Sequence, residues 1–185
     1  TGVYDKNRAF HVTVSPSMDI LISSNLERLL CHMAGQAVTK QEMQHLQETG
    51  KYNIDITEKR IVGEFATQEE TFDAIRTIYR KTGYVMDTHT AVAYASYKKY
   101  QKETKSQTPM VIVSTASPYK FAKDVMTALD SSCAEQDAFY LMEVLERVSG
   151  VKIPKVIEGI SNKTVLHKTV CKKENIKAFV REHLQ

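Results

Sequence analysis

Three small hydroxyl residues follow a short apolar run in the second half of the chain. Ser114, Thr115 and Ser117 come directly after Met110–Val113. Hydroxyls in this position can bind a ligand, because the ligands of open α/β sheets lie outside the carboxyl ends of the strands. The same residues can instead cap a helix, since Ser117 is a favourable N-cap and Pro118 suits the first helical position. Spacing alone favours the capping role.

The apolar run before these hydroxyls predicts a buried strand. It is too short for a stable helix and partly β-branched, which is typical of a strand covered on both faces in a parallel sheet. Apolar residues then return at helical spacing from Phe121 to Leu129. We therefore expect a strand, a tight loop and a helix, with Met110–Ser114 as an inner strand.

The rest of the chain alternates helical patterns with short apolar stretches. N-cap and capping-box residues predict four helices, which begin near Asn25, Thr39, Thr67 and Asp87. Hydrophobic periodicity predicts two more, over about residues 138–148 and 176–184. Short strands are expected at residues 11–14, 52–56 and 84–86. This alternation predicts an α/β fold with three layers, in which a short, mostly parallel sheet is flanked by helices, and residues 1–185 as a single domain.

Composition narrows the possible functions. The 185 residues are 42% hydrophobic and 25% charged, as in an ordinary globular protein. Basic and acidic residues are mixed along the chain, so no basic stripe indicates nucleic acid, and no apolar run approaches the ~20 residues that span a membrane. Cys31, Cys133 and Cys171 lack the spacing of a zinc site or a disulfide framework. No metal site is predicted, and the cytoplasm is the simplest location.

The sequence contains neither a glycine-rich phosphate loop nor the local signature of a catalytic triad. A cationic segment, Lys98, Lys99, Lys102 and Lys105, closes the helix predicted after Asp87. Because a helix C-terminus favours cations, we interpret these lysines as a solvated helix end rather than a phosphate site.

Four segments resemble one enzyme family. Ser114–Phe121 reads Ser-Thr-Ala-Ser-Pro-Tyr-Lys-Phe and resembles the Ser-Thr-Ala-x-Pro-x-Lys-Phe signature near the C-terminus of bacterial and fungal threonine synthases. Ser15–Arg28 is similar to the family's Ser-Pro-x-Met-Asp-Ile…Asn-Phe/Leu-Glu-Arg segment. Asp87–Ala91 is similar to its Asp-Pro-His-x-Ala segment, with Thr88 in place of the usual Pro. Thr1–Asp5 is similar to the stretch just after the family's phosphate-binding glycine loop, and the four segments come in the family's order.

The resemblance implies a pyridoxal-phosphate enzyme of the tryptophan-synthase-β fold type (fold type II), of which this chain would form part of the catalytic domain. Such enzymes convert O-phosphohomoserine and water to L-threonine and phosphate. The residue that matches their cofactor-binding hydroxyl, which donates to a neutral ring nitrogen, is Thr115, with Ser114 as the neighbour that could be mistaken for it. Asp87 and His89 either face the same crevice or only begin a helix.

The resemblance also bears on how much of the enzyme this chain supplies. In that family the Schiff-base lysine and the loop that holds the cofactor phosphate lie upstream of the segment that matches Thr1. We therefore expect the chain to be the C-terminal part of a larger catalytic chain, partnered by the remaining N-terminal part and inactive alone. Two alternatives stay open: a non-catalytic α/β module for a small anion or for interactions, and another pyridoxal enzyme of the same fold type.

Overall fold

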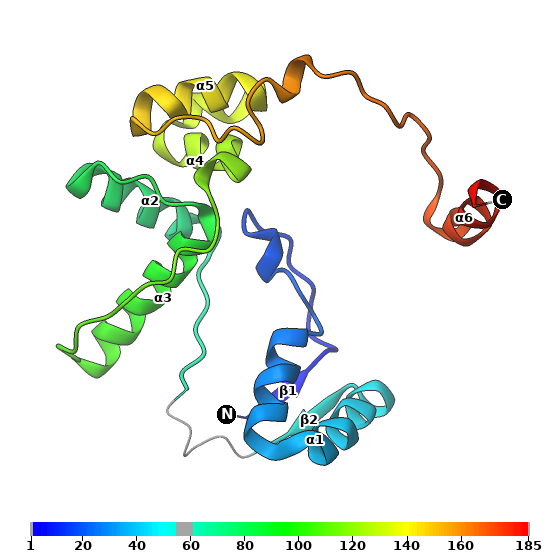
Figure 1. Ribbon diagram of the computed structural model, residues 1–185. Helices are drawn as coiled ribbons and strands as arrows, with labels where there is room; N and C mark the ends of the chain where they lie inside the picture. Colours follow the sequence, from blue (N-terminus) through cyan, green and yellow to red (C-terminus); the bar gives the residue numbers. More distant parts are fainter. Residues whose placement is uncertain (1, 55–60, 185) are drawn as a thin grey trace. The chain divides into compact units, whose positions relative to one another are not determined.

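The structure is a computed structural model that describes residues 2–54 and 61–184 (Figure 1). Helices make up most of the regular structure in these ranges, and the longer ones are α1 (Ser24–Thr49), α2 (Gln68–Thr82), α3 (Thr88–Thr104), α4 (Ala122–Leu129), α5 (Ala138–Ser149) and α6 (Ile176–His183). Internal contacts divide the chain into two units, Thr1–Lys152 and Ile153–Gln185. That residues 1–185 form a single domain stays a prediction.

Two short strands and a long helix form the first part of the larger unit. The strand β1 (Val3–Asp5) pairs antiparallel with β2 (Lys51–Asn53), and Tyr4 lies opposite Tyr52. The two tyrosine rings stack with their centroids 5.3 Å apart. Because Tyr52 also belongs to the buried cluster of α1, the two strands and the helix share a small core.

The helix α1 is kinked in its first half. Gly35 has φ 84° and ψ 166°, which is not helical, so the boundary predicted between two helices lies at this kink. The capping box predicted at Thr39 is wrong, because the Thr39 hydroxyl donates to the Gly35 carbonyl at 2.8 Å instead of capping a new helix. Glycine tolerates this backbone conformation, and no heavy atom stands where a Cβ would be.

Four helices pack together in the second part of the larger unit. The capping box predicted for α2 is confirmed: the Glu70 amide donates to the Thr67 hydroxyl at 3.2 Å, and the Thr67 amide donates to the Glu70 carboxylate at 2.7 Å. The helix α2 packs on α3 and α4, and α4 packs on α5. Their core is made of small and apolar side chains, including Ala74, Ile75, Ala91, Ala95, Val125, Met126, Leu141 and Leu145.

Tyr119 connects this core to the end of α5. Its ring is fully buried and its hydroxyl donates to the Val151 carbonyl. We expect Tyr119→Phe to lower the free energy of unfolding by about 1 kcal/mol, because a hydrogen bond is lost while the ring still packs. Chemical denaturation of the full-length protein measures this loss. Tyr140→Phe is the control, since Tyr140 is half exposed and its hydroxyl has no hydrogen bond among the described residues; an equal loss in both variants would contradict the assignment.

The prediction that Met110–Ser114 is an inner strand is wrong for this structure. The segment has no regular secondary structure, and the side chains of Val111 and Val113 are 85% and 72% exposed. A strand depends on hydrogen bonds to a neighbouring strand, and no described segment pairs with this one. The apolar run is therefore extended without a partner.

The predicted parallel sheet is also not seen in residues 2–54 and 61–184. The sheet described there has two antiparallel strands, and the structure is α-rich rather than three-layered. The stretches at 11–14 and 84–86 are not strands, although Val85 and Met86 are buried. The stretch at 52–56 is a strand only to Asn53, and its residues 55 and 56 lie outside the described ranges.

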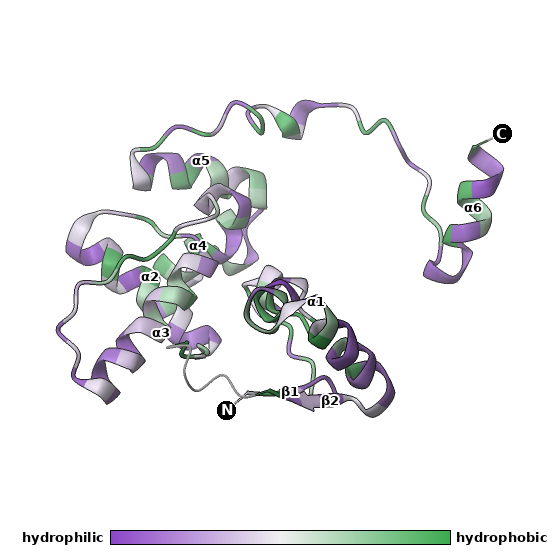
Figure 2. Ribbon diagram, turned by 60° about the horizontal axis from the view of Figure 1, so that its bottom comes forward, coloured by the Kyte–Doolittle hydropathy of each residue, from purple (hydrophilic) through white to green (hydrophobic). Residues whose placement is uncertain are grey.

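The smaller unit is mostly extended chain with one longer helix. The helix predicted near the C-terminus is confirmed as α6, which carries hydrophobic and hydrophilic residues (Figure 2). Phe179 stacks on His183 with their ring centroids 4.0 Å apart. Across the described chain, no helix combines the length and the apolar character needed to cross a bilayer.

Candidate functional site

The start of α3 is built around a buried carboxylate. Asp87 is the N-cap of the helix, and its side chain is 1% exposed. The backbone amides of His89 and Thr90 donate to it at 2.9 and 3.3 Å, and the Thr90 hydroxyl donates to its second oxygen. These donors, together with the partial positive charge of the helix N-terminus, compensate the carboxylate. The N-cap predicted at Asp87 is confirmed.

The Thr90 hydroxyl joins α3 to the segment that follows Met110–Val113. Thr90 Oγ1 lies 3.0 Å from Ser114 Oγ. A hydroxyl has one proton, and the carboxylate of Asp87 can only accept, so Thr90 donates to Asp87 and the Ser114 hydroxyl donates to Thr90. The side chain of Ser114 is thereby fixed to a buried network, although the residue itself is exposed.

His89 joins the same helix start to a third segment. The Ser17 amide donates to His89 Nε2 at 3.2 Å across 72 residues of sequence. Because Nε2 accepts, the proton of the neutral ring is on Nδ1, which lies 3.3 Å from Asp87 Oδ1. The ring also packs on Phe121, with 4.7 Å between the centroids. Segments around residues 17, 89 and 121 are thus held together by one imidazole.

This contact predicts the behaviour of a single amide. We expect His89→Leu to speed hydrogen exchange of the Ser17 amide roughly fivefold, because it removes the acceptor of a bond that contributes about 1 kcal/mol. His89→Gln should restore part of the protection, since its side-chain oxygen can accept near the position of Nε2. NMR-detected exchange measures both, with the Leu26 amide, which donates to the Ser23 hydroxyl, as the control. Equal Ser17 rates in all three proteins would contradict the role of His89.

The three hydroxyl residues predicted at the site differ in their hydrogen bonds within the chain. Ser117 accepts from the Tyr119 amide at 3.3 Å, so the predicted cap is confirmed. Ser114 is engaged by Thr90. Thr115 is exposed, and its hydroxyl has no hydrogen bond to any residue in the ranges the structure describes. Of the three hydroxyls, that of Thr115 is therefore the one without a hydrogen bond to the described residues.

Sequence reasoning missed Thr90 and Ser17. A signal for Thr90 was present, because a hydroxyl three residues after an N-cap can reach back to the capping side chain. No signal pointed to Ser17, whose contribution is a backbone amide. Residues with metal-ligand side chains do not gather in groups of three or more in the described part of the chain.

Comparison with known proteins agrees with this arrangement. Residues 90–179 match the family model described as "Threonine synthase, C-terminal". Threonine synthase from Saccharomyces cerevisiae is 32% identical over 176 residues, which cover 82% of this chain and 34% of that protein. The human protein named "Threonine synthase-like 1" is 39% identical over 137 residues, 70% of this chain and 18% of that protein. These matches support a C-terminal segment of the family of threonine synthases and threonine synthase-like proteins.

Solved structures extend the likeness to the fold. The crystal structure of the yeast threonine synthase matches 99% of this chain and 38% of its own, with a TM-score of 0.71 and 26% identity. The threonine synthase of Brucella melitensis, whose structure is described as PLP bound, matches with a TM-score of 0.65 and 28% identity, over 99% of this chain and 36% of its own. Pyridoxal phosphate is therefore the cofactor found in this family. The chain spans between 18% and 38% of the length of these relatives.

Proposed function

We propose that this chain forms the C-terminal part of the catalytic domain of a pyridoxal-phosphate-dependent threonine synthase. The full-length protein would convert O-phosphohomoserine and water to L-threonine and phosphate, with the N-terminal part of the same enzyme as partner. We further propose that the two parts together form a fold-type II domain and that the enzyme is cytoplasmic. One observation supports it most: the three segments that resemble the family most closely contact one another at the start of α3.

The chain offers a hydroxyl that fits the cofactor. Bound pyridoxal phosphate supplies an electron sink for a carbanion of the substrate. A hydroxyl that donates to a neutral ring nitrogen suits a weaker sink than a carboxylate would, and Thr115 is exposed without a partner among the described residues. The carboxylate of Asp87, which is linked to the neighbouring Ser114 through Thr90, accepts from amide and hydroxyl donors instead. This difference supports Thr115 as the residue that faces the cofactor.

The neighbouring residues would hold Thr115 in place. Ser114 is tied through Thr90 to the buried carboxylate of Asp87, so the residue before Thr115 has a fixed side chain. Ser117 caps the next turn on the other side. Thr88 stands where the family has Pro, and because Asp87 caps the helix by itself, the substitution leaves the helix start intact. The role of this chain is thus to orient one donor, while the covalent chemistry belongs to the N-terminal part.

A phosphate-release assay tests the proposal. We expect the full-length protein, loaded with pyridoxal phosphate, to release phosphate from O-phosphohomoserine with one threonine formed per phosphate. Residues 1–185 alone should release none above a cofactor-only blank, because the family's Schiff-base lysine lies outside the segments matched here. Turnover by residues 1–185 alone would contradict the proposed division of the site.

A second candidate function follows from the names of the relatives. The human protein, with 39% identity, is called threonine synthase-like rather than threonine synthase. If the full-length protein binds pyridoxal phosphate and releases phosphate without threonine, it is another pyridoxal enzyme of this fold type. If it neither binds the cofactor nor turns over, the non-catalytic alternative replaces the proposal.

A further inference from the structure

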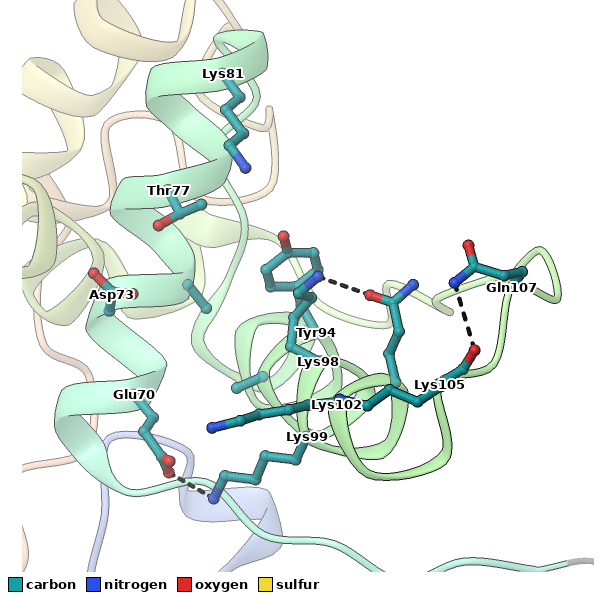
Figure 3. Close-up of a pocket in the computed structure, with 13 residues that line it drawn as sticks. Glu70, Asp73, Thr77, Lys81, Tyr94, Lys98, Lys99, Lys102, Lys105 and Gln107 are labelled. Carbon is teal, nitrogen blue, oxygen red and sulfur yellow. Dashed lines mark hydrogen bonds and ion pairs between the residues drawn. The ribbon is translucent and has the colours of Figure 1, made fainter.

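A groove lined with lysines lies between α2 and α3. Its volume is about 610 Å³, and its lining includes five lysines, Lys81, Lys98, Lys99, Lys102 and Lys105 (Figure 3). Three of these residues belong to the second half of α3, whereas Asp87 and His89 stand at its beginning. At 1.5 Å per residue, the distance from Asp87 to Lys98 and Lys102 along the helix is roughly 15–25 Å. The groove is therefore separate from the site proposed above.

Two carboxylates, those of Glu70 and Asp73, line the groove together with the lysines. The Lys99 ammonium lies 2.8 Å from the Glu70 carboxylate, and this hydrogen bond, with that of the Thr67 amide, lowers the pKa of Glu70. Asp73 lies 3.9 Å from the guanidinium of Arg76, which is closer to Glu69, at 2.6 Å. The five lysines of the groove thus outnumber its two carboxylates, and one of these, Glu70, is paired with Lys99.

The remaining lysines have no carboxylate partner in the part of the chain that the structure describes. Lys98 donates to the side-chain oxygen of Gln101 at 2.8 Å, a neutral group. Lys81, Lys102 and Lys105 have no acidic side chain within 4.0 Å in the ranges 2–54 and 61–184. Figure 3 shows Lys81 on α2 and Lys102 on α3 extending toward the space between the helices. Like charges around one groove repel each other, and a multivalent anion there would relieve the repulsion.

The helix end alone does not account for this arrangement. A helix C-terminus favours cations in its own last turn, which covers Lys81 in α2 and Lys102 in α3 but not Lys98, which lies earlier in α3. Tyr94 lines the same groove over the buried Ala74 and Ala95, so an aromatic ring lies beside the cations. The interpretation of the lysines as only solvated helix ends therefore accounts for Lys81 and Lys102 but leaves Lys98 unexplained.

We propose that this groove binds a small molecule that carries a chain of two or more phosphate groups. Lysine binds phosphate as a compact point charge, whereas planar carboxylates are better matched by the arginine fork, and no arginine of the described residues lines the groove. Its volume falls within the roughly 300–1,000 Å³ typical of sites for small ligands. Several uncompensated ammonium groups call for several negative charges close together. The ring of Tyr94 would accept a flat group, such as the base of a nucleotide.

Calorimetric titration of the full-length protein, saturated with pyridoxal phosphate, tests this site without any turnover. Inorganic tripolyphosphate and ATP, both free of divalent cations, are the two probes. We expect both to bind and to weaken as salt is raised, with ATP tighter if the ring of Tyr94 takes the base. Lys98→Gln/Lys102→Gln should weaken binding at least tenfold. The matched control, Lys172→Gln/Lys173→Gln, removes the same charge from exposed positions near α6 and should change binding less than twofold.

Three outcomes would overturn the site. If neither tripolyphosphate nor ATP binds, the groove is not a phosphate site. Equal loss in the two double variants would show that binding follows net charge and not the groove. Tighter binding of a poly-glutamate peptide than of tripolyphosphate would assign the groove to an acidic protein partner instead. Because the readout is binding at lysines outside the proposed active site, its failure would leave the proposed enzymatic function untouched.

Discussion

Replacing Thr115 with valine in the full-length protein is expected to reduce turnover of O-phosphohomoserine about tenfold or more. Valine keeps nearly the same volume and loses the hydroxyl. A neutral hydrogen bond contributes about 0.5–1.5 kcal/mol, and an unpaired buried partner adds to the loss, while each ~1.4 kcal/mol is a factor of ten in rate. Thr115→Ser should keep most activity, because its hydroxyl survives. Steady-state phosphate release, measured with pyridoxal phosphate in excess, gives these ratios.

The controls for Thr115 separate its hydroxyl from its neighbourhood. Thr108→Val makes the same change at an exposed threonine in the preceding connector and should leave turnover within twofold. Thr115→Asp should shift the visible absorption of the loaded enzyme, since a carboxylate beside the ring nitrogen favours its protonation. If Thr115→Val binds cofactor and turns over like the parent, Thr115 does not contact the cofactor and the site assignment is wrong.

Replacing Asp87 with alanine is expected to lower the free energy of unfolding by about 3 kcal/mol. The change removes an N-cap, worth about 0.5–2 kcal/mol, and leaves the buried Thr90 hydroxyl without its acceptor, which costs about 1–3 kcal/mol more. Asp87→Asn should lose less, because its side-chain oxygen still accepts from the amides of His89 and Thr90. Urea denaturation of the full-length protein, followed by far-UV circular dichroism, measures the differences.

The chain provides a matched control for Asp87. Asp137 caps α5 in the same way, accepting from the amides of Phe139 and Tyr140 at 2.9 and 3.0 Å, but it is exposed. Asp137→Ala should therefore cost only about 1 kcal/mol, the typical value of a solvated cap. A loss at Asp87 no larger than at Asp137 would mean that burial of the carboxylate network adds nothing to stability.

The helices could be predicted from the sequence because their signals are local. The capping box at Thr67 and the N-cap at Asp87 each act within one turn, and the structure has both. The strand at Met110–Ser114 could not, because a strand depends on a neighbour that the local sequence does not specify. Whether such a segment becomes a buried strand depends on a neighbouring strand that pairs with it. The described residues contain no strand that pairs with this segment.

The candidate site shows the same division. That Asp87 and Ser117 cap helices follows from residue type and position, and the structure confirms it. The link from Thr90 to Ser114 and the acceptance of the Ser17 amide by His89 join residues 24 and 72 positions apart. Neither hydrophobic periodicity nor motif spacing predicts hydrogen bonds between residues so far apart in the sequence. Only the family resemblance indicated that these segments belong together.

The exposed extended segment 110–113 has a consequence for handling residues 1–185 by themselves. A short apolar stretch with unpaired backbone groups is a template for β-pairing between molecules. At the concentrations used for crystallisation or NMR, the isolated chain should self-associate through this stretch. Val111→Lys, which places a charge on the exposed edge, should keep it in solution, and thioflavin fluorescence would follow the difference.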